Sequence, residues 1–163
     1  MIPKFASDSA SRVGELRNRT TSLQDDSLIH AVTYIATLIA MAAIDAVWLT
    51  STSNILYRST LGDIMLANVK VGPAVAFYLL YPIGLTVFAV EPAFKSGSIG
   101  PALAYGALFG LIAYAAYDLT NYATLRNWTL MLTVLDMTWG TIVSALASAV
   151  AFYVVKATLG LPS

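Results

Sequence analysis

Four long apolar stretches constrain the fold of this chain more than any other feature of its sequence. They cover roughly residues 27–50, 71–90, 101–121 and 128–155. A helix needs about 20 mostly apolar residues to cross a bilayer, and each stretch is of that length or longer. Charged residues make up 11% of the chain, against about 25% in a soluble domain. The sequence therefore predicts an all-α, integral membrane four-helix bundle with up-down-up-down topology.

The segments around the apolar stretches are polar or carry helix-breaking residues. Glu91-Pro92 predicts a stop after the second stretch, and Pro101 suits the first turn of the third helix. The expected organisation is a polar, flexible N-terminal tail over residues 1–26, a membrane domain over 27–156 and a short C-terminal tail over 157–163. The first apolar stretch begins too late and is too long for a signal peptide.

The distribution of lysine and arginine predicts the orientation of the bundle, because cytoplasmic segments carry an excess of these residues. The side that holds the tail, the second loop and the C-terminus carries Lys4, Arg12, Arg17, Arg19, Lys95 and Lys156. The opposite side carries Arg58, Lys70 and Arg126. We therefore expect both termini in the cytoplasm.

Three of the four stretches contain an aspartate: Asp45, Asp118 and Asp136. A carboxylate at the centre of a membrane helix costs roughly 2.5–3.5 kcal/mol, so three of them need a reason. With alternating helix directions, all three lie in the same half of the membrane, on the side of the first and third loops. We expect their carboxyl groups to face the bundle interior, within about 12 Å of one another.

The residues after these aspartates repeat a spacing. Asp45 and Asp136 are each followed three positions later by a tryptophan, and Asp118 by an asparagine. Residues three apart share a helix face, so these side chains point where the carboxylates point. The candidate pocket consists of Asp45, Trp48, Tyr117, Asp118, Asn121, Asp136 and Trp139. The alternative is a hydrogen-bond network that only fixes helix register.

Other residues favour structural roles. Tyr57 and Trp128 lie at span ends, where such residues form an interfacial belt. Two stripes of small residues predict close helix contacts, and they consist of Ala102, Gly106 and Gly110 in the third span and Gly140, Ser144 and Ser148 in the fourth.

Several kinds of site are not expected. His30 is the only histidine and lies a membrane thickness from the acids, so we expect no metal site. Nucleophile motifs, phosphate-binding loops and dinucleotide fingerprints are absent from the sequence, and we expect no cofactor. The sequence has no basic stripe, which argues against nucleic acid as a partner. It has no cysteine, which excludes disulfides and thiolate chemistry.

Four segments resemble a bacterial family of small four-span predicted membrane proteins, catalogued as domain of unknown function 2177. They are "IDAVWL" at 44–49, "FYLLYPIGLTVF" at 77–88, "GALFGLIAYAAYDLTNYATLRNW" at 106–128 and "LDMTWG" at 135–140. The resemblance runs from about residue 28 to 155, and residues 1–26 look like an extension beyond it. It implies a multi-pass protein of the bacterial inner (plasma) membrane and brings no established activity.

Three functions remain open at this point. The first is a pocket in the outer half of the bundle that binds or moves a cation, a protonated amine or a proton, with the lipid bilayer as its setting. The second is an intramembrane enzyme that acts on a lipid or isoprenoid by carboxylate acid–base chemistry. The third is a structural or assembly subunit in which the acids only hold the helices together through hydrogen bonds. Four spans are few for a monomeric transporter, which leaves a homodimer open. The sequence names no substrate and leaves open whether the protein is an enzyme.

Overall fold

The computed structural model describes the backbone of residues 4–159 and the side chains of residues 26–62 and 64–159. All elements in that part of the chain are helical. They are α1 (Lys4–Thr52), the π-helical η1 (Ser53–Tyr57), α2 (Arg58–Leu61), the 3-10 turn η2 (Gly62–Ile64), α3 (Val71–Leu85), the π-helical η3 (Thr86–Val90), α4 (Glu91–Ser96), α5 (Ile99–Thr124) and α6 (Leu130–Leu159). The predicted all-α fold is confirmed.

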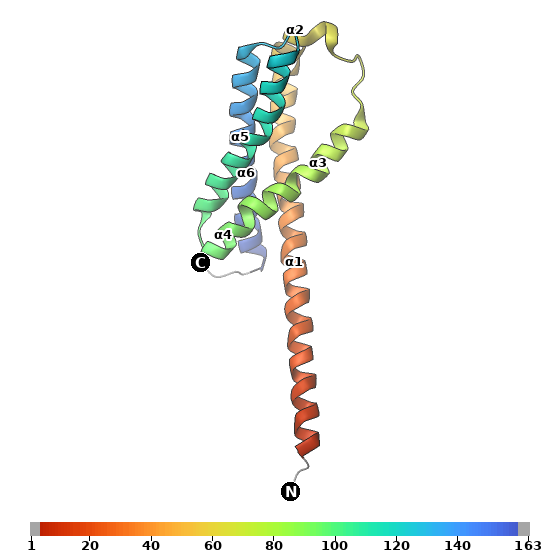
Figure 1. The fold of residues 1–163 in the computed structure, drawn as a ribbon, viewed down its shortest axis with the longest axis vertical. Coiled ribbons are helices and arrows are strands. Elements are labelled where there is room, and N and C mark those ends of the chain that lie inside the picture. The colour runs from red at the N-terminus through yellow and green to blue at the C-terminus, as the bar shows by residue number, and fades with distance from the viewer. Residues whose placement is uncertain (1–3, 160–163) are drawn as a thin grey trace.

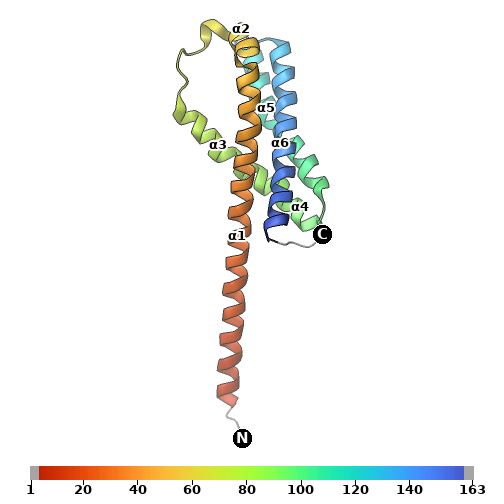
Figure 2. The ribbon, with the colours of Figure 1, turned by 180° about the vertical axis from the view of Figure 1, so that it is seen from behind.

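The four long segments alternate in direction (Figure 1). α1 rises to α2, the α3–η3–α4 segment returns, α5 rises again and α6 descends, and the reverse view shows the same order (Figure 2). The segments long and apolar enough to cross a membrane are Asp26–Leu61, Val71–Ser96, Ile99–Thr124 and Leu130–Leu159. This confirms the predicted four-helix bundle of candidate spans. We call its two ends the α2 end and the α4 end.

Two helices extend beyond the stretches predicted from hydropathy. The first continues from Thr52 through a π-helical turn to Leu61. The second does not stop at Glu91-Pro92, which corrects that expectation, but continues to Ser96 and ends at Gly97 with φ 66°. The N–H of Glu91 closes the π-helical turn on the carbonyl of Thr86, so the missing N–H of the proline falls in the first turn of α4, where it is tolerated.

The predicted tail is the start of α1, which begins at Lys4 and is continuous with the first span. The side chains of residues 1–25 and the structure of residues 160–163 lie outside the described part of the chain. The division into a tail over 1–26, a domain over 27–156 and a tail over 157–163 stays a prediction.

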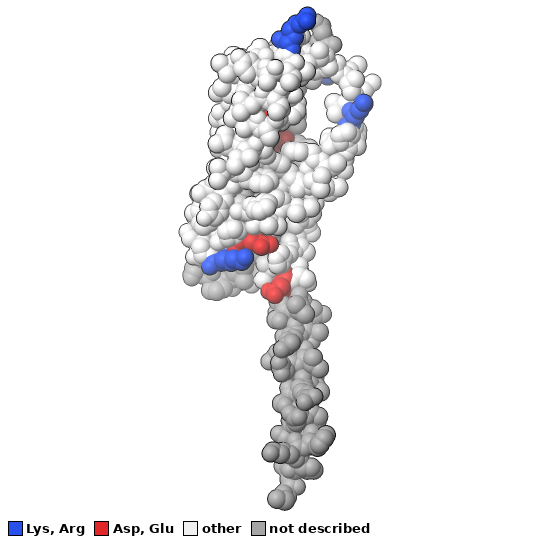
Figure 3. Space-filling model, viewed as in Figure 1, with Lys and Arg blue, Asp and Glu red and all other residues white. Residues whose placement is uncertain are grey.

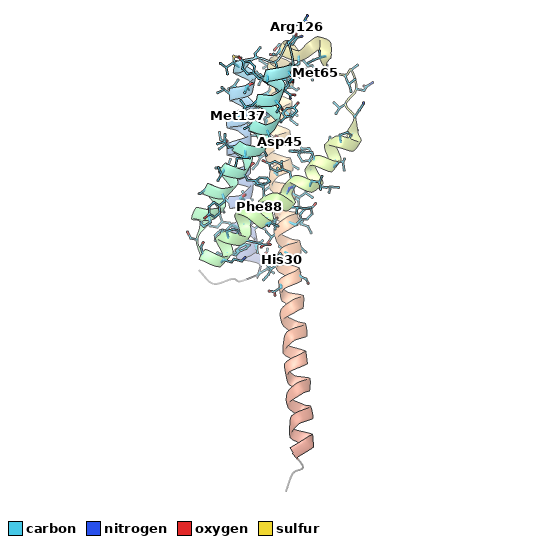
Figure 4. All side chains as sticks on the ribbon, viewed as in Figure 1. His30, Asp45, Met65, Phe88, Arg126 and Met137 are labelled. Carbon is cyan, nitrogen blue, oxygen red and sulfur yellow. The ribbon has the colours of Figure 1, made fainter. Side chains whose placement is uncertain are left out.

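At the α4 end, a contact between His30 and Glu91 links α1 to α4. Nε2 of His30 lies 3.0 Å from Oε1 of Glu91, and Nδ1 of His30 lies 2.6 Å from the carbonyl oxygen of Asp26. Glu91 is therefore part of the α1–α4 contact. His30 lies at the α4 end of the bundle, well below Asp45 (Figure 4).

The closest packing in the bundle is between α5 and α6. A Cβ atom on Gly106 would lie 2.8 Å from Oγ of Ser148 and 2.9 Å from the carbonyl oxygen of Ser144. One on Gly110 would overlap the carbonyl oxygen of Gly140. The two predicted small-residue stripes are thus confirmed as one helix–helix contact, and the close approach depends on the glycines.

The first half of α3 stands away from the bundle. α3 packs mainly against α1 and only slightly against α5. The space-filling view shows an opening between the start of α3 and the rest of the bundle near the α2 end (Figure 3). Further along, Tyr81 and Leu85 are buried against Met41 and Val143, so α3 joins the core only in its second half.

Candidate functional site

The three carboxylates are buried in the half of the bundle nearer the α2 end. Asp45 is 6% exposed, Asp118 0% and Asp136 6%, and they come from α1, α5 and α6. Figure 4 shows Asp45 near the middle height of the bundle, well above His30. Each is therefore held inside the bundle and away from lipid, as the cost of a membrane carboxylate requires.

Both carboxylate oxygens of Asp45 accept hydrogen bonds from other helices. Nε1 of Trp139 on α6 donates to Oδ1 at 2.9 Å. The hydroxyl of Tyr78 on α3 donates to Oδ2. One carboxylate thus ties three helices together, and its orientation is fixed from both sides.

A continuous chain of contacts leads from Asp45 to Asp136. The ring of Trp139 stacks on that of Trp48, with centroids 4.4 Å apart and planes 7° from parallel. Nε1 of Trp48 donates to the hydroxyl of Tyr57 at 3.1 Å, and that hydroxyl donates in turn to Oδ1 of Asp136. We call Asp45, Trp48, Tyr57, Tyr78, Asp136 and Trp139 the acid–aromatic network.

The repeated Asp-x-x-Trp spacing accounts for much of this arrangement. Each tryptophan lies one turn after its aspartate, and α1 and α6 are packed neighbours. Trp139 reaches across to Asp45, while Trp48 reaches towards Asp136 through Tyr57. Tyr57 is carried by the π-helical turn η1, a local irregularity of the kind that is frequent at functional sites.

A pocket of about 320 Å³ opens beside the network. Its walls come from α3, α5 and α6, and it is lined by Phe77, Tyr81, Ala113, Tyr114, Tyr117 and Asp136. This volume is at the lower end of the roughly 300–1,000 Å³ usual for small-molecule sites. Asp136 belongs to both the network and the pocket wall, so it connects the two.

The aromatic walls of the pocket are held in place by their neighbours. The hydroxyl of Tyr81 hydrogen-bonds with Oγ of Ser144 at 2.8 Å, and its ring lies edge-on to Tyr114 with centroids 6.4 Å apart. The ring of Tyr114 occupies the space that a side chain at Gly140 would fill. Tyr117 lies edge-on to Trp128, with centroids 5.4 Å apart.

Asp118 lies outside the acid–aromatic network. It is fully buried, and neither of its carboxylate oxygens has a hydrogen-bond partner in the described part of the chain. The burial of Asp118 disfavours its charged form, and the carboxylate of Asp136 is near enough to repel it. A buried carboxyl group without a partner is costly, so this position needs an explanation beyond helix packing.

The predicted site residues thus fall into three groups. Asp45, Trp48, Asp136 and Trp139 join the network. Tyr117 lines the pocket, and Asn121 is half-buried one helical turn after Tyr117. Asp118 is part of neither the network nor the pocket wall. A ligand-binding role for these seven residues stays a prediction.

Sequence reasoning missed several members of the site: Tyr57, Phe77, Tyr78, Tyr81 and Tyr114. The sequence places Tyr57 in an interfacial belt because the first apolar stretch ends near residue 50; the helix in fact continues to Leu61, and Tyr57 still faces the bundle. Trp128, assigned to the same belt, is buried and donates to Oγ1 of Thr133 at 3.2 Å. In α3, the spacing of Tyr78 and Tyr81 on one helix face was a usable signal.

Four candidate spans around buried acids that are hydrogen-bonded to aromatic side chains define a multi-pass membrane protein. The chain belongs to the family described as predicted membrane protein (DUF2177), whose profile matches residues 30–153. This confirms the resemblance noted in the sequence. Comparisons with curated proteins and with solved structures found no match.

Proposed function

We propose that this protein binds an organic cation, such as a protonated amine, in the pocket beside the acid–aromatic network. The observation that supports this most directly is the pocket's lining: one carboxylate, Asp136, among the rings of Phe77, Tyr81, Tyr114 and Tyr117. Aromatic faces attract cations, by about 2 kcal/mol or more where water is excluded. A carboxylate supplies the full counter-charge.

The network around Asp136 suits this role. Tyr57 donates to Oδ1 of Asp136 and holds the carboxylate in one orientation. Asp45 fixes Trp139, and Trp139 supports Trp48 behind Tyr57. Binding groups that are held by a second layer of contacts lose little entropy when the ligand arrives.

Asp118 adds to the negative potential of the site. It is buried, has no hydrogen-bond partner among the residues that the structure describes, and lies within reach of the charge of Asp136, so a cation near Asp136 relieves the repulsion between the two carboxyl groups. Asn121 is half-buried and lies one helical turn after the pocket residue Tyr117, and we assign it a positioning role.

We place the protein in the bacterial inner membrane with both termini in the cytoplasm. The basic residues in the described part of the α2 end are Arg58, Lys70 and Arg126, and further basic residues lie in the α1 sequence and at the α4 end. Under the positive-inside rule the α2 end faces outward. The pocket then lies in the outer half of the membrane, where it would bind the cation or take part in moving it.

A second candidate function is intramembrane acid–base catalysis on a lipid or isoprenoid. The observation in its favour is the contrast between two neighbouring carboxyl groups: Asp136 accepts a hydrogen bond from Tyr57, and Asp118 has no hydrogen-bond partner among the described residues. Two carboxyls in different surroundings are the usual arrangement for an acid and a base. In this case Asp118→Asn abolishes turnover of a lipid substrate, whereas under the cation-binding function it only weakens binding.

Calorimetric titration of the purified protein in lipid nanodiscs tests cation binding, with benzyltrimethylammonium as the probe. Asp136→Asn removes the charge and nearly keeps the shape, and we expect it to weaken binding at least tenfold, or about 1.4 kcal/mol. Glu91→Gln is the matched control, because it makes the same change at the α4 end and should leave the affinity unchanged. Equal affinity for the wild type and Asp136→Asn, or no binding by either, rules out the proposal.

A further inference from the structure

The pocket lies at the seam between α3 and α5, where the two helices have little contact. Two of its lining residues are also part of the molecular surface: Phe77 on α3 is 39% exposed and Tyr117 on α5 is 57% exposed. A residue that both lines a pocket and is exposed marks the place where the pocket opens. The opening is therefore lateral, in the side of the bundle between two spans.

The surface around this opening is apolar. Phe77 and Tyr117 are themselves aromatic, and Leu80, one helical turn after Phe77 on α3, is 67% exposed inside a candidate span. In a membrane these side chains face the hydrocarbon of the bilayer. A strongly hydrated ligand would have to leave water and cross this apolar rim, which is costly for any charged group without a partner.

We propose that the ligand is a membrane-dissolved amphiphile with a cationic head group, which reaches the pocket from the bilayer between α3 and α5. This inference rests on the proposed cation binding and adds the class of ligand and its route. The head group binds at Asp136 among the tyrosines, and the apolar chain passes out beside Phe77 and Tyr117 into the hydrocarbon. The volume of about 320 Å³ accommodates a head group, and the chain remains in lipid.

The divergence of α3 agrees with this route. The bond from Tyr78 to Asp45 and the burial of Tyr81 attach the middle and second half of α3 to the bundle, while its first half leans away (Figure 3). Lipid chains can therefore reach the pocket wall without any movement of α5 or α6.

Cysteine accessibility in nanodiscs tests the inference, because the native chain has no cysteine and each variant carries a single thiol. Ala113→Cys places the thiol in the pocket wall. Ile112→Cys, one residue along on the exposed face, is the lipid-facing control, and Arg126→Cys in the loop is the water-facing control. Each is labelled with a lipid-soluble maleimide and with a sulfonated maleimide confined to water.

We expect the labelling pattern of Ala113→Cys to resemble that of Ile112→Cys. The lipid-soluble reagent should label both variants at least ten times faster than it labels Arg126→Cys. Dodecyltrimethylammonium should protect Ala113→Cys from labelling. Dodecyl maltoside, which has the same alkyl chain but no charge, should not protect it. Tetramethylammonium, which has the charge but no chain, should protect it only at far higher concentration. Fast labelling of Ala113→Cys by the sulfonated reagent, with equal protection by tetramethylammonium, overturns lateral access and leaves cation binding intact. Equal protection by dodecyl maltoside and dodecyltrimethylammonium instead refutes cation binding itself.

Discussion

Removing the two donors of Asp45 tests whether the acid–aromatic network holds the bundle together. Tyr78→Phe deletes the hydroxyl that donates to Oδ2, and Trp139→Phe deletes the N–H that donates to Oδ1. A hydrogen bond to a charged group contributes about 1.5–3 kcal/mol in soluble proteins, and interhelical polar contacts in membranes contribute about 0.6–1.7 kcal/mol. We therefore expect Tyr78→Phe to lower the free energy of unfolding by about 1–2 kcal/mol.

Trp139→Phe should cost more, because it also reduces the stacked contact with Trp48, a kind of contact that contributes about 0.5–1.5 kcal/mol. In the double variant, Asp45 is buried without either donor. The loss of unfolding free energy should then exceed the sum of the single losses by about 0.5–3 kcal/mol, the range for residues that share a partner.

Equilibrium unfolding in mixed micelles measures these differences. Tyr105→Phe is the matched control, because Tyr105 is an exposed tyrosine outside the network, and its variant should unfold within about 0.5 kcal/mol of the wild type. If Tyr78→Phe and Trp139→Phe both unfold like Tyr105→Phe, the network does not bind the helices together and the reasoning is refuted.

Three further predictions concern packing, orientation and the N-terminal segment. Gly110→Ala should lower the free energy of unfolding by about 1–3 kcal/mol, because the added Cβ overlaps a backbone oxygen of α6. Gly72→Ala is the control and should cause no such loss, because a Cβ at Gly72 has nothing within 4 Å. Equal losses for both variants would contradict the packing account. An impermeant thiol reagent added outside intact cells should label Asn68→Cys and spare Ser96→Cys, and the reverse pattern would invert the orientation. Removing residues 1–24 should leave a cooperatively unfolding bundle, because all four candidate spans lie beyond them; loss of cooperative unfolding would make the segment a structural element.

Hydropathy and helix alternation were enough to predict four spans and the burial of the three aspartates. The backbone N–H and C=O groups in a run of about 20 apolar residues must find hydrogen bonds inside the membrane, and a helix supplies them within the run itself. Once the helices alternate, the position of Asp45, Asp118 or Asp136 along its span determines its level in the bundle. The cost of a carboxylate in lipid then turns each one inward, and all three are buried.

The partners of the acids could not be predicted in the same way. The role of Tyr57 depends on a π-helical turn that prolongs the first helix, and such a turn cannot be recognised from hydropathy. The lean of α3, and with it the pocket between Phe77 and Tyr117, results from tertiary packing against α1 and α5. The isolation of Asp118 depends on which side chains the neighbouring helices bring to it, and spacing along one helix says nothing about that.

Ligand-linked stability tests the central claim most directly, namely that Asp136 is the counter-charge for an organic cation. A ligand that binds only the folded state raises the free energy of unfolding, by about 2.7 kcal/mol at a concentration of 100 times Kd. With benzyltrimethylammonium as ligand, the account predicts a concentration-dependent rise in the unfolding free energy of the wild type and of Glu91→Gln, and none for Asp136→Asn. The same rise in all three proteins, or no rise in the wild type, would contradict it.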